Sequence, residues 1–401
     1  MASLRTLLSL FFLITTSMAH AKVWQAVNAW DEHYESLYSE WVQENYKYNI
    51  FSNPSSPWYG IATDCADAVY AVRIIFAYEN ALPVAFTNIE NMRPTLTNTM
   101  SNWDHLPEKQ RLRAFINQVS YLTSTKTLGY DTYPIKIDRT IFRPGVIFLN
   151  PALTREEENI VGTRGGHAEI VTEIEENGYI RTLYSTTPMK VRDLITTRNP
   201  YSWPLSRLGG YRAWKTAAPK PFISNEQFSM ADWRENVAPT RKQIYQWHES
   251  IRKILRVRPP TVDERIDVVV ESICNLWQGR VLAVSAAWDS IQNNGGRCLS
   301  ASLMDEHSTH KRDARLREAY GQLNDLTYWK KQNYPADENT DGSIRDAKEV
   351  LRRCQVITGV ANTDAWELFL KMIDGHLSPD AAWHPAVRWG ETSPQRGVRC
   401  R

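Results

Sequence analysis

Apolar residues repeat at helical spacing in three stretches of the N-terminal half. From residue 22 to 48 they recur every three or four positions. The same period begins at Ala66 and fades near Asn80, and Pro83 prevents a longer helix. A third helix is expected around 108–122. The first stretch carries its apolar face on Val23, Ala26, Trp30, Tyr34, Leu37 and Trp41.

The hydrophobic period changes to two after Pro144. Residues 145–150 (GVIFLN) predict a short buried strand, and residues 167–174 (HAEIVTEI) alternate strictly between apolar and polar. Asn177-Gly178 is a strong signal for a hairpin turn, so the chain is expected to return along 179–187 (YIRTLYSTT). A helix followed by an antiparallel sheet predicts an α+β domain that ends near Lys220.

Four segments are therefore expected along the chain. Residues 1–21 combine one arginine, a short apolar run and Ala-His-Ala, which is typical of a secretory signal peptide. An N-terminal helical segment (22–56) and the α+β domain (57–220) follow. Residues 221–401 form a mainly α-helical domain. After cleavage no transmembrane segment is expected, and the mature protein is predicted to be periplasmic or secreted.

The composition excludes one class of partner. Hydrophobic residues make up 42% of the chain, which is enough for proper cores. The 47 basic and 45 acidic residues nearly cancel. Because no basic field stands out, nucleic acid is not expected as a partner.

Five cysteines are distributed unevenly along the chain. In an exported protein the four in the C-terminal third are expected to form disulfides among themselves, with the connectivity open. That leaves Cys65 as an unpaired thiol, which needs a reason in an oxidising compartment. The four disulfide candidates are Cys274, Cys298, Cys354 and Cys400.

Cys65 is predicted to lie at the start of a helix, where the dipole and the free backbone N–H groups lower a thiol pKa. A backbone N–H at the same place also suits an oxyanion. His167 opens a strand after a Gly165-Gly166 loop, at the rim of the predicted sheet, and is the best-placed base. With a two-residue turn, Glu169 would face Thr186 across the hairpin, so both are candidates to orient the imidazole.

These residues resemble the NlpC-type cysteine peptidases of peptidoglycan, a branch of the papain-like superfamily. The resemblance is carried in order by Trp58-Tyr59-Gly60, Asp64-Cys65 opening a helix, Leu82-Pro83, Arg143-Pro144-Gly145 before a strand, and Gly166-His167-Ala168 at the start of the next strand. It implies a papain-like helix and antiparallel sheet, followed here by the extra helical domain.

The resemblance also implies roles. Cys65 would be the nucleophile, His167 the base and Tyr59 a contributor on the oxyanion side. Asp64 is interpreted as a helix-start acid beside the nucleophile, with a substrate contact as the alternative. The expected reaction is cleavage of an amide bond in a cell-wall peptide, so the expected partner is peptidoglycan or its fragments, without a required cofactor.

Three alternatives stay open at this point. The same pair of residues could transfer an acyl group or cleave an ester, or the protein could bind the cell wall without catalysis, with the C-terminal domain contacting a protein partner. Separately, Asp337, Asn339 and Asp341 occupy positions of a calcium-binding loop whose twelfth position is Lys348. A solvated acidic turn is the simpler interpretation, and structural calcium is the alternative.

Overall fold

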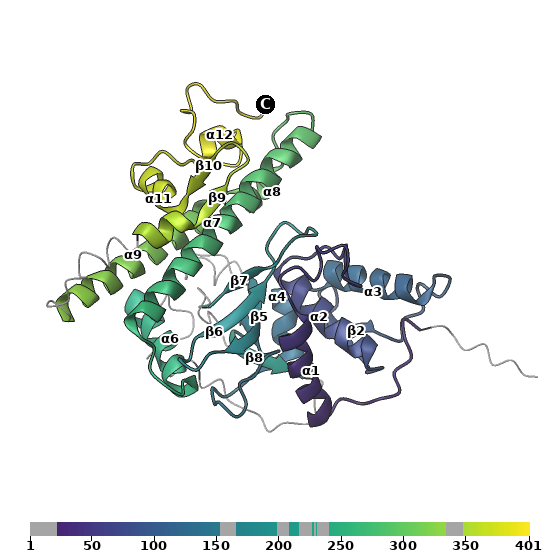
Figure 1. The fold of residues 1–401 in the computed structure, drawn as a ribbon. Coiled ribbons are helices and arrows are strands. Elements are labelled where there is room, and N and C mark those ends of the chain that lie inside the picture. Colours follow the sequence, from purple (N-terminus) through teal and green to yellow (C-terminus); the bar gives the residue numbers. More distant parts are fainter. Residues whose placement is uncertain are drawn as a thin grey trace, which may run out of the picture.

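Helices and antiparallel strands make up the chain, which confirms the predicted α+β class (Figure 1). The predicted signal peptide and the acidic loop with Asp337, Asn339 and Asp341 lie outside the residues that the structure describes. The computed structural model describes residues 22–152, 166–198, 208–215, 227, 230, 240–333 and 348–401.

Helix α1 (Glu32–Asn45) begins later than the sequence pattern predicts. Asp31 caps it by accepting a hydrogen bond from Tyr34 N at 2.9 Å. Residues 22–31 are not helical, because their large side chains instead anchor an extended segment: Trp24 Nε1, for example, donates to Leu82 O at 2.9 Å. The helix itself lies against the helix that carries Cys65.

Helix α2 (Cys65–Glu79) has Cys65 as its first residue, as expected. The Asp64 side chain accepts hydrogen bonds from Ala66 N and Asp67 N, and the Asp67 carboxylate accepts one from Asp64 N. This reciprocal capping box specifies where the helix begins. Every residue from Cys65 to Ala77 is buried, so α2 is a central helix of the fold.

A buried ion pair joins α1 to α2. Arg73 Nη2 lies 2.6 Å from Glu35 Oε1, and the guanidinium also sits 3.3 Å from the centre of the Trp30 ring. Removing one partner of such a pair would leave an uncompensated buried charge, which typically costs about 3–5 kcal/mol. The pair therefore fixes how the N-terminal segment docks.

Six strands form one antiparallel sheet in the order β3-β8-β4-β5-β6-β7. The predicted strand 167–174 is present with those bounds, and the strand predicted at 145–150 begins two residues later. The strands are β3 (Thr132–Pro134), β4 (Ile147–Asn150), β5 (His167–Ile174), β6 (Ile180–Tyr184), β7 (Ile195–Thr197) and β8 (Gly210–Trp214).

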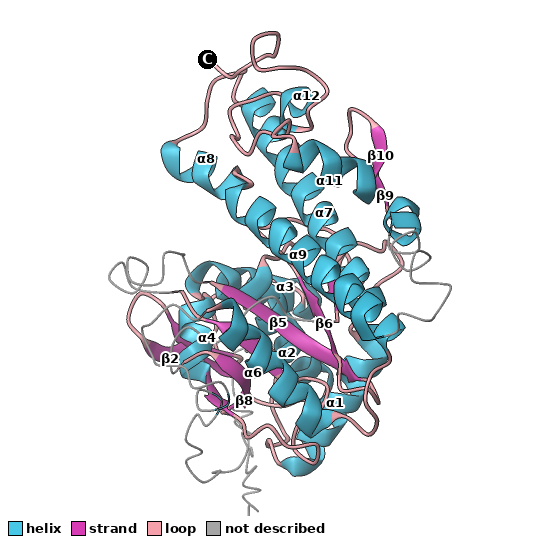
Figure 2. Cartoon of the chain, turned by 90° about the vertical axis from the view of Figure 1, so that its left-hand side faces the viewer, coloured by secondary structure: helices cyan, strands magenta, loops and turns pink. Residues whose placement is uncertain are grey.

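Both faces of the sheet are covered. Ile147, Leu149 and Ile170 pack in the hydrophobic cluster that includes α1 and α2, while Phe148 and Val171 point to the other side. There they meet helix α6 (Arg241–Leu255), which Figure 2 shows against the sheet. Helix α6 thus packs with the sheet, although the sequence pattern assigned its residues to the helical domain.

The β5–β6 hairpin differs from the prediction in its turn. Ile170 pairs with Leu183 and Val171 with Thr182, a bulge follows, and Glu175 N donates to Tyr179 O. The two-residue turn at Asn177-Gly178 is therefore wrong, because the loop is longer than two residues. Strand β6 is displaced by two residues relative to the expected register. Each side chain therefore stays on the expected face of the sheet, but each residue of β5 lies opposite a different residue of β6.

Four further elements lie between α2 and β3 in the chain. The helix predicted at 108–122 is present with those bounds, whereas the sequence pattern missed a two-stranded hairpin and a short helix before β3. These elements are β1 (Ala85–Asn88), β2 (Arg93–Thr97), α3 (Glu108–Leu122) and α4 (Thr125–Asp131).

The C-terminal residues build a separate apolar cluster around Trp277 and Trp389. Cys274 pairs with Cys354 and Cys298 with Cys400, which confirms the expected disulfides, and Cys65 is free. The elements are α7 (Val262–Asn293), α8 (Ala301–His307), α9 (His310–Asn333), β9 (Gln355–Ile357), β10 (Asn362–Asp364), α11 (Ala365–Ile373) and α12 (Pro385–Arg388).

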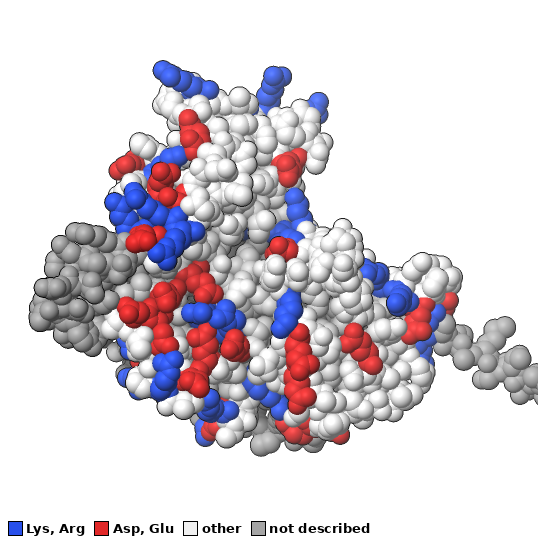
Figure 3. All heavy atoms as spheres, viewed as in Figure 1, with Lys and Arg blue, Asp and Glu red and all other residues white. Residues whose placement is uncertain are grey.

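Charged side chains of both signs are interspersed over the face shown in Figure 3, with large uncharged areas between them. This agrees with the near balance of basic and acidic residues in the sequence. Within the described ranges, the apolar stretches of the helices are all too short or too polar to cross a bilayer.

Candidate active site

The start of α2 faces the start of β5, so Cys65 lies beside the backbone that carries His167, while among the described residues no hydrogen bond joins the Cys65 sulfur to the imidazole. Cys65 Sγ lies 4.0 Å from the carbonyl oxygen of Gly166, the residue before His167, and it also receives a hydrogen bond from the backbone N–H of Ala168. The sulfur therefore touches the chain on both sides of His167. The starts of α2 and β5, about a hundred positions apart in sequence, are thus brought together at one end of the strands.

The imidazole of His167 is oriented by a carboxylate from its own strand. His167 Nε2 lies 2.7 Å from Glu169 Oε1. A carboxylate only accepts hydrogen bonds, so Nε2 carries the proton and Nδ1 keeps its lone pair. Glu169 is 2% exposed, and its other oxygen accepts a hydrogen bond from the Thr182 hydroxyl. The series Thr182, Glu169, His167 fixes the ring and its tautomer.

Tyr184 packs against the same imidazole. Its ring centre lies 4.8 Å from that of His167, with the planes at 85°. An edge-to-face contact of this kind restricts ring rotation about the side-chain bonds. Tyr184 and Thr182 are the residues that the sequence analysis missed. The correct hairpin register would have found both, since they sit across the strand pair from Glu169.

The pKa of the Cys65 thiol is shifted in the opposite direction to the one expected from the sequence. Burial raises the pKa of the Cys65 thiol, and the neighbouring Asp64 carboxylate raises it further, while backbone hydrogen bonds from Ala168 and Ala66 act in the opposite direction. The helix N-terminus was expected to lower this pKa, so that prediction is wrong in its net direction. At neutral pH the resting sulfur is a thiol, and a base must remove its proton.

A backbone donor is available beside the sulfur. The capping box uses the N–H groups of Ala66 and Asp67, and within the described part of the chain Cys65 N makes no hydrogen bond. An N–H at the first helical position points out of the helix end, and a free donor beside the nucleophile is the kind of group that an oxyanion requires.

The remaining sequence candidates lie differently. Asp64 is the N-cap of α2, as expected. Thr186 lies beyond the end of β6 and does not bond Glu169; Thr182 takes that place because the hairpin register is displaced. Tyr59 is 46% exposed, and within the described residues neither a hydrogen bond nor a ring contact joins it to Cys65 or His167.

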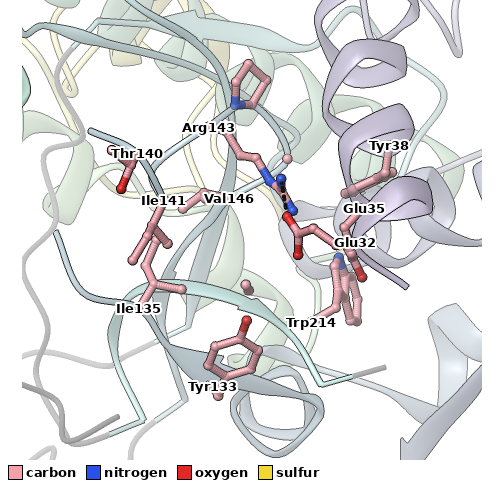
Figure 4. Close-up of a pocket in the computed structure, with 13 residues that line it drawn as sticks. Glu32, Glu35, Tyr38, Tyr133, Ile135, Thr140, Ile141, Arg143, Val146 and Trp214 are labelled. Carbon is pink, nitrogen blue, oxygen red and sulfur yellow. Dashed lines mark hydrogen bonds and ion pairs between the residues drawn. The ribbon is translucent and has the colours of Figure 1, made fainter. Parts of the chain in front are cut away.

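A cavity of about 250 Å³ lies elsewhere on the sheet (Figure 4). Its lining includes Pro144 to Val146, just before β4, and the ion pair between Arg143 and Glu32 at 2.8 Å. His167 pairs with Asn150 at the other end of β4. Cavity and Cys65 site therefore belong to opposite ends of the strands.

Metal chemistry receives no positive support from the geometry. Over the ranges that the structure describes, no three His, Cys, Asp or Glu side chains are gathered as metal ligands. The acidic loop considered for calcium falls outside those ranges, so the calcium alternative stays a prediction.

Comparison with protein-family models, with curated proteins and with solved structures gives no match. The resemblance to the NlpC-type peptidases therefore depends on the quoted motif residues alone.

The raised thiol pKa makes a testable prediction. At pH 7 we expect iodoacetamide to alkylate Cys65 at least about tenfold more slowly than the same thiol in the unfolded chain, because less thiolate is present. The rate should climb through pH 9. Asp64→Asn, which keeps a good N-cap but removes the charge, should accelerate alkylation. A rate that is already maximal below pH 7 would contradict this assignment.

Proposed function

We propose that the protein is an exported cysteine hydrolase that cleaves an amide bond in cell-wall peptides. Two contacts at the start of β5 carry the proposal: His167 Nε2 lies 2.7 Å from Glu169 Oε1, and Cys65 Sγ lies 4.0 Å from the carbonyl oxygen of Gly166, the residue before His167. They support a nucleophile, a base and an orienting group of the kind that acyl transfer needs. The helix-and-sheet arrangement supports a papain-like catalytic domain.

The proposed reaction begins with proton transfer. His167 Nδ1 takes the proton of the Cys65 thiol as the sulfur attacks the peptide carbonyl, and Cys65 N–H donates to the oxygen that becomes negative. The imidazolium then gives its proton to the leaving amine, and a thioester remains on Cys65. Water, deprotonated by the same imidazole, attacks the thioester, releasing the carboxylic acid and restoring the thiol.

The proposed substrate class and the proposed location of the protein rest on different observations. A cell-wall peptide is favoured by the motif resemblance, which covers the residues around Cys65 and His167. Export is favoured by the two disulfides, because such bonds persist in oxidising compartments. A periplasmic or secreted protein would meet peptidoglycan there, and the C-terminal helices would be free to contact wall or protein partners.

Incubation with purified sacculi and soluble muropeptides tests the proposal directly. The mature protein should release fragments whose masses show the gain of one water per bond cleaved, and Cys65→Ser should release none. The fragments would identify the bond. A product carrying the acyl group on another acceptor would instead establish acyl transfer.

The burial of Cys65 gives one rival a specific basis. A buried thiol with a raised pKa also suits a structural cysteine, and then the protein would bind the wall without cleaving it. Unchanged sacculi and muropeptides, together with a Cys65 that resists alkylation until the chain unfolds, would support that function and refute hydrolysis.

A further inference from the structure

The loop between β6 and β7 runs beside the residues that precede Cys65. Thr63 and Lys190 form an antiparallel bridge, in which Thr63 N donates to Lys190 O at 3.1 Å. Ser185 Oγ also donates to Thr63 O, at 2.8 Å. Residues 185–194 therefore run beside the start of α2, where Cys65 lies.

Arg192 in this loop holds a buried guanidinium with too few partners. It is 8% exposed, and its Nη2 donates to Pro188 O, yet Nε and Nη1 make no hydrogen bond. Asp64 is the acid whose charge acts on it, but these two described residues form no ion pair. A guanidinium offers donors in a fork that matches a carboxylate, so Arg192 has capacity for an anionic ligand.

Helix α9 carries two more cations, of which Arg312 lies within electrostatic range of Arg192. Arg312 Nη1 donates to Ser308 O at 3.1 Å, and Arg315 is exposed one turn further along the helix. Burial lowers the pKa of Arg312 to about 10, and the positive charges of Arg315 and Arg192 lower it in addition. Arg312 therefore lies close enough to Arg315 and to Arg192 to be repelled by both.

Acidic residues near these arginines do not cancel the charge. Asp313 is held by Arg280, with Nε 2.7 Å from Oδ1, and by the hydroxyl of Thr309. Asp64 serves the start of α2, and Glu306 is a further carboxylate whose pKa responds to both Asp64 and Arg312. With exposed Lys190 included, these four described cations outnumber the described carboxylates near them that form no ion pair.

Tyr184 connects this cluster to the proposed catalytic residues. Its ring contacts His167. Burial and the charge of Glu169 raise the pKa of Tyr184, while the charges of Arg315 and Arg312 act in the opposite direction. Tyr184 therefore lies within electrostatic range of both arginines and in contact with His167. Helices α7 and α9 lie side by side above the sheet in Figure 2. Asn275 of α7 also donates to Thr196 O of β7, which holds the helices in place.

We propose that Arg192, Arg312 and Arg315 form a subsite for a substrate carboxylate beside the scissile amide, so that the helical C-terminal part completes the active site and the substrate is an acidic peptide. This inference rests on the proposed hydrolase function. In this subsite the guanidinium of Arg192 donates hydrogen bonds to the substrate carboxylate, and Arg312 and Arg315 attract and hold that carboxylate by their positive charge.

The test compares soluble muropeptides that carry free carboxylates with the same muropeptides after amidation of those groups. Arg192→Gln is expected to raise KM for the acidic peptides roughly ten- to hundredfold, with kcat changed far less. Arg315→Glu, at an exposed position that folding does not need, should raise it roughly three- to tenfold. Neither variant should change KM for the amidated peptides. Arg317→Glu, two residues along α9 and on another face, is the charge-matched control.

Binding to the Cys65→Ser variant separates the two proposals. Calorimetric titration with acidic muropeptides should show binding that weakens at high salt and with Arg315→Glu. Binding without any turnover by the wild type would refute the hydrolase and leave the subsite standing. Turnover with equal KM for acidic and amidated peptides, or equal effects of Arg315→Glu and Arg317→Glu, would refute the subsite and leave the hydrolase standing.

Discussion

Replacing His167 by alanine is expected to lower kcat/KM for muropeptide cleavage by roughly 10⁴-fold or more. The Cys65 thiol has a raised pKa, so without the imidazole almost no thiolate forms at neutral pH. The side chain of His167 is 14% exposed at the rim of the sheet, and its loss should leave the thermal transition nearly unchanged. Steady-state kinetics and a melting curve check both expectations.

His33 offers a matched control, because it is an exposed histidine on α1, away from the Cys65 site. His33→Ala should keep full activity. Activity of His167→Ala within tenfold of the wild type, in a folded protein, would rule out His167 as the base.

The second large effect is expected at Glu169, and it should depend on the substitution. Glu169→Gln keeps an oxygen that accepts from His167 Nε2 and an amide that can donate to Thr182, so we expect roughly a tenfold loss in kcat. Glu169→Ala removes the orienting group, and the imidazole can take the other tautomer, so a loss of roughly 10²- to 10⁴-fold is expected. KM should change little in both variants.

Thr182→Val separates orientation from packing. Valine fills a similar volume but cannot donate to Glu169, so kcat should fall by less than in Glu169→Ala and the protein should stay folded. If Glu169→Gln and Glu169→Ala lose the same activity, the carboxylate contributes its charge and not the position of the ring, and the orienting role is wrong.

Local patterns were enough to predict several elements. The bounds of α3 and β5 match the prediction, and α2 begins at Cys65, because apolar period, proline and a capping acid all act within a few residues. The position of His167 at a strand start followed from the same alternation. These are features that the chain encodes over short distances.

The rest depended on long-range contacts. The longer turn and the bulge after Val171 together displace the partner strand by two residues, so the residue that bonds the Glu169 carboxylate is Thr182 and not Thr186. The net pKa of Cys65 likewise depends on burial among distant residues, which outweighs the helix dipole. The closeness of Arg312 to Arg192 could not be foreseen either, since nothing local in the sequence relates α9 to the loop 185–194.

Helix α2 is buried throughout from Cys65 to Ala77, so the proposed nucleophile and the proposed substrate-binding residues lie on elements of different exposure. A change on this helix disturbs the core, so the position of the sulfur has little freedom to drift during evolution. The exposed side chains of the loop 185–194, Met189 and Val191 among them, and the exposed side of α9 carry no such constraint. Descendants of this chain could therefore acquire new substrate preferences by surface substitutions alone, while the reacting atoms stay where they are.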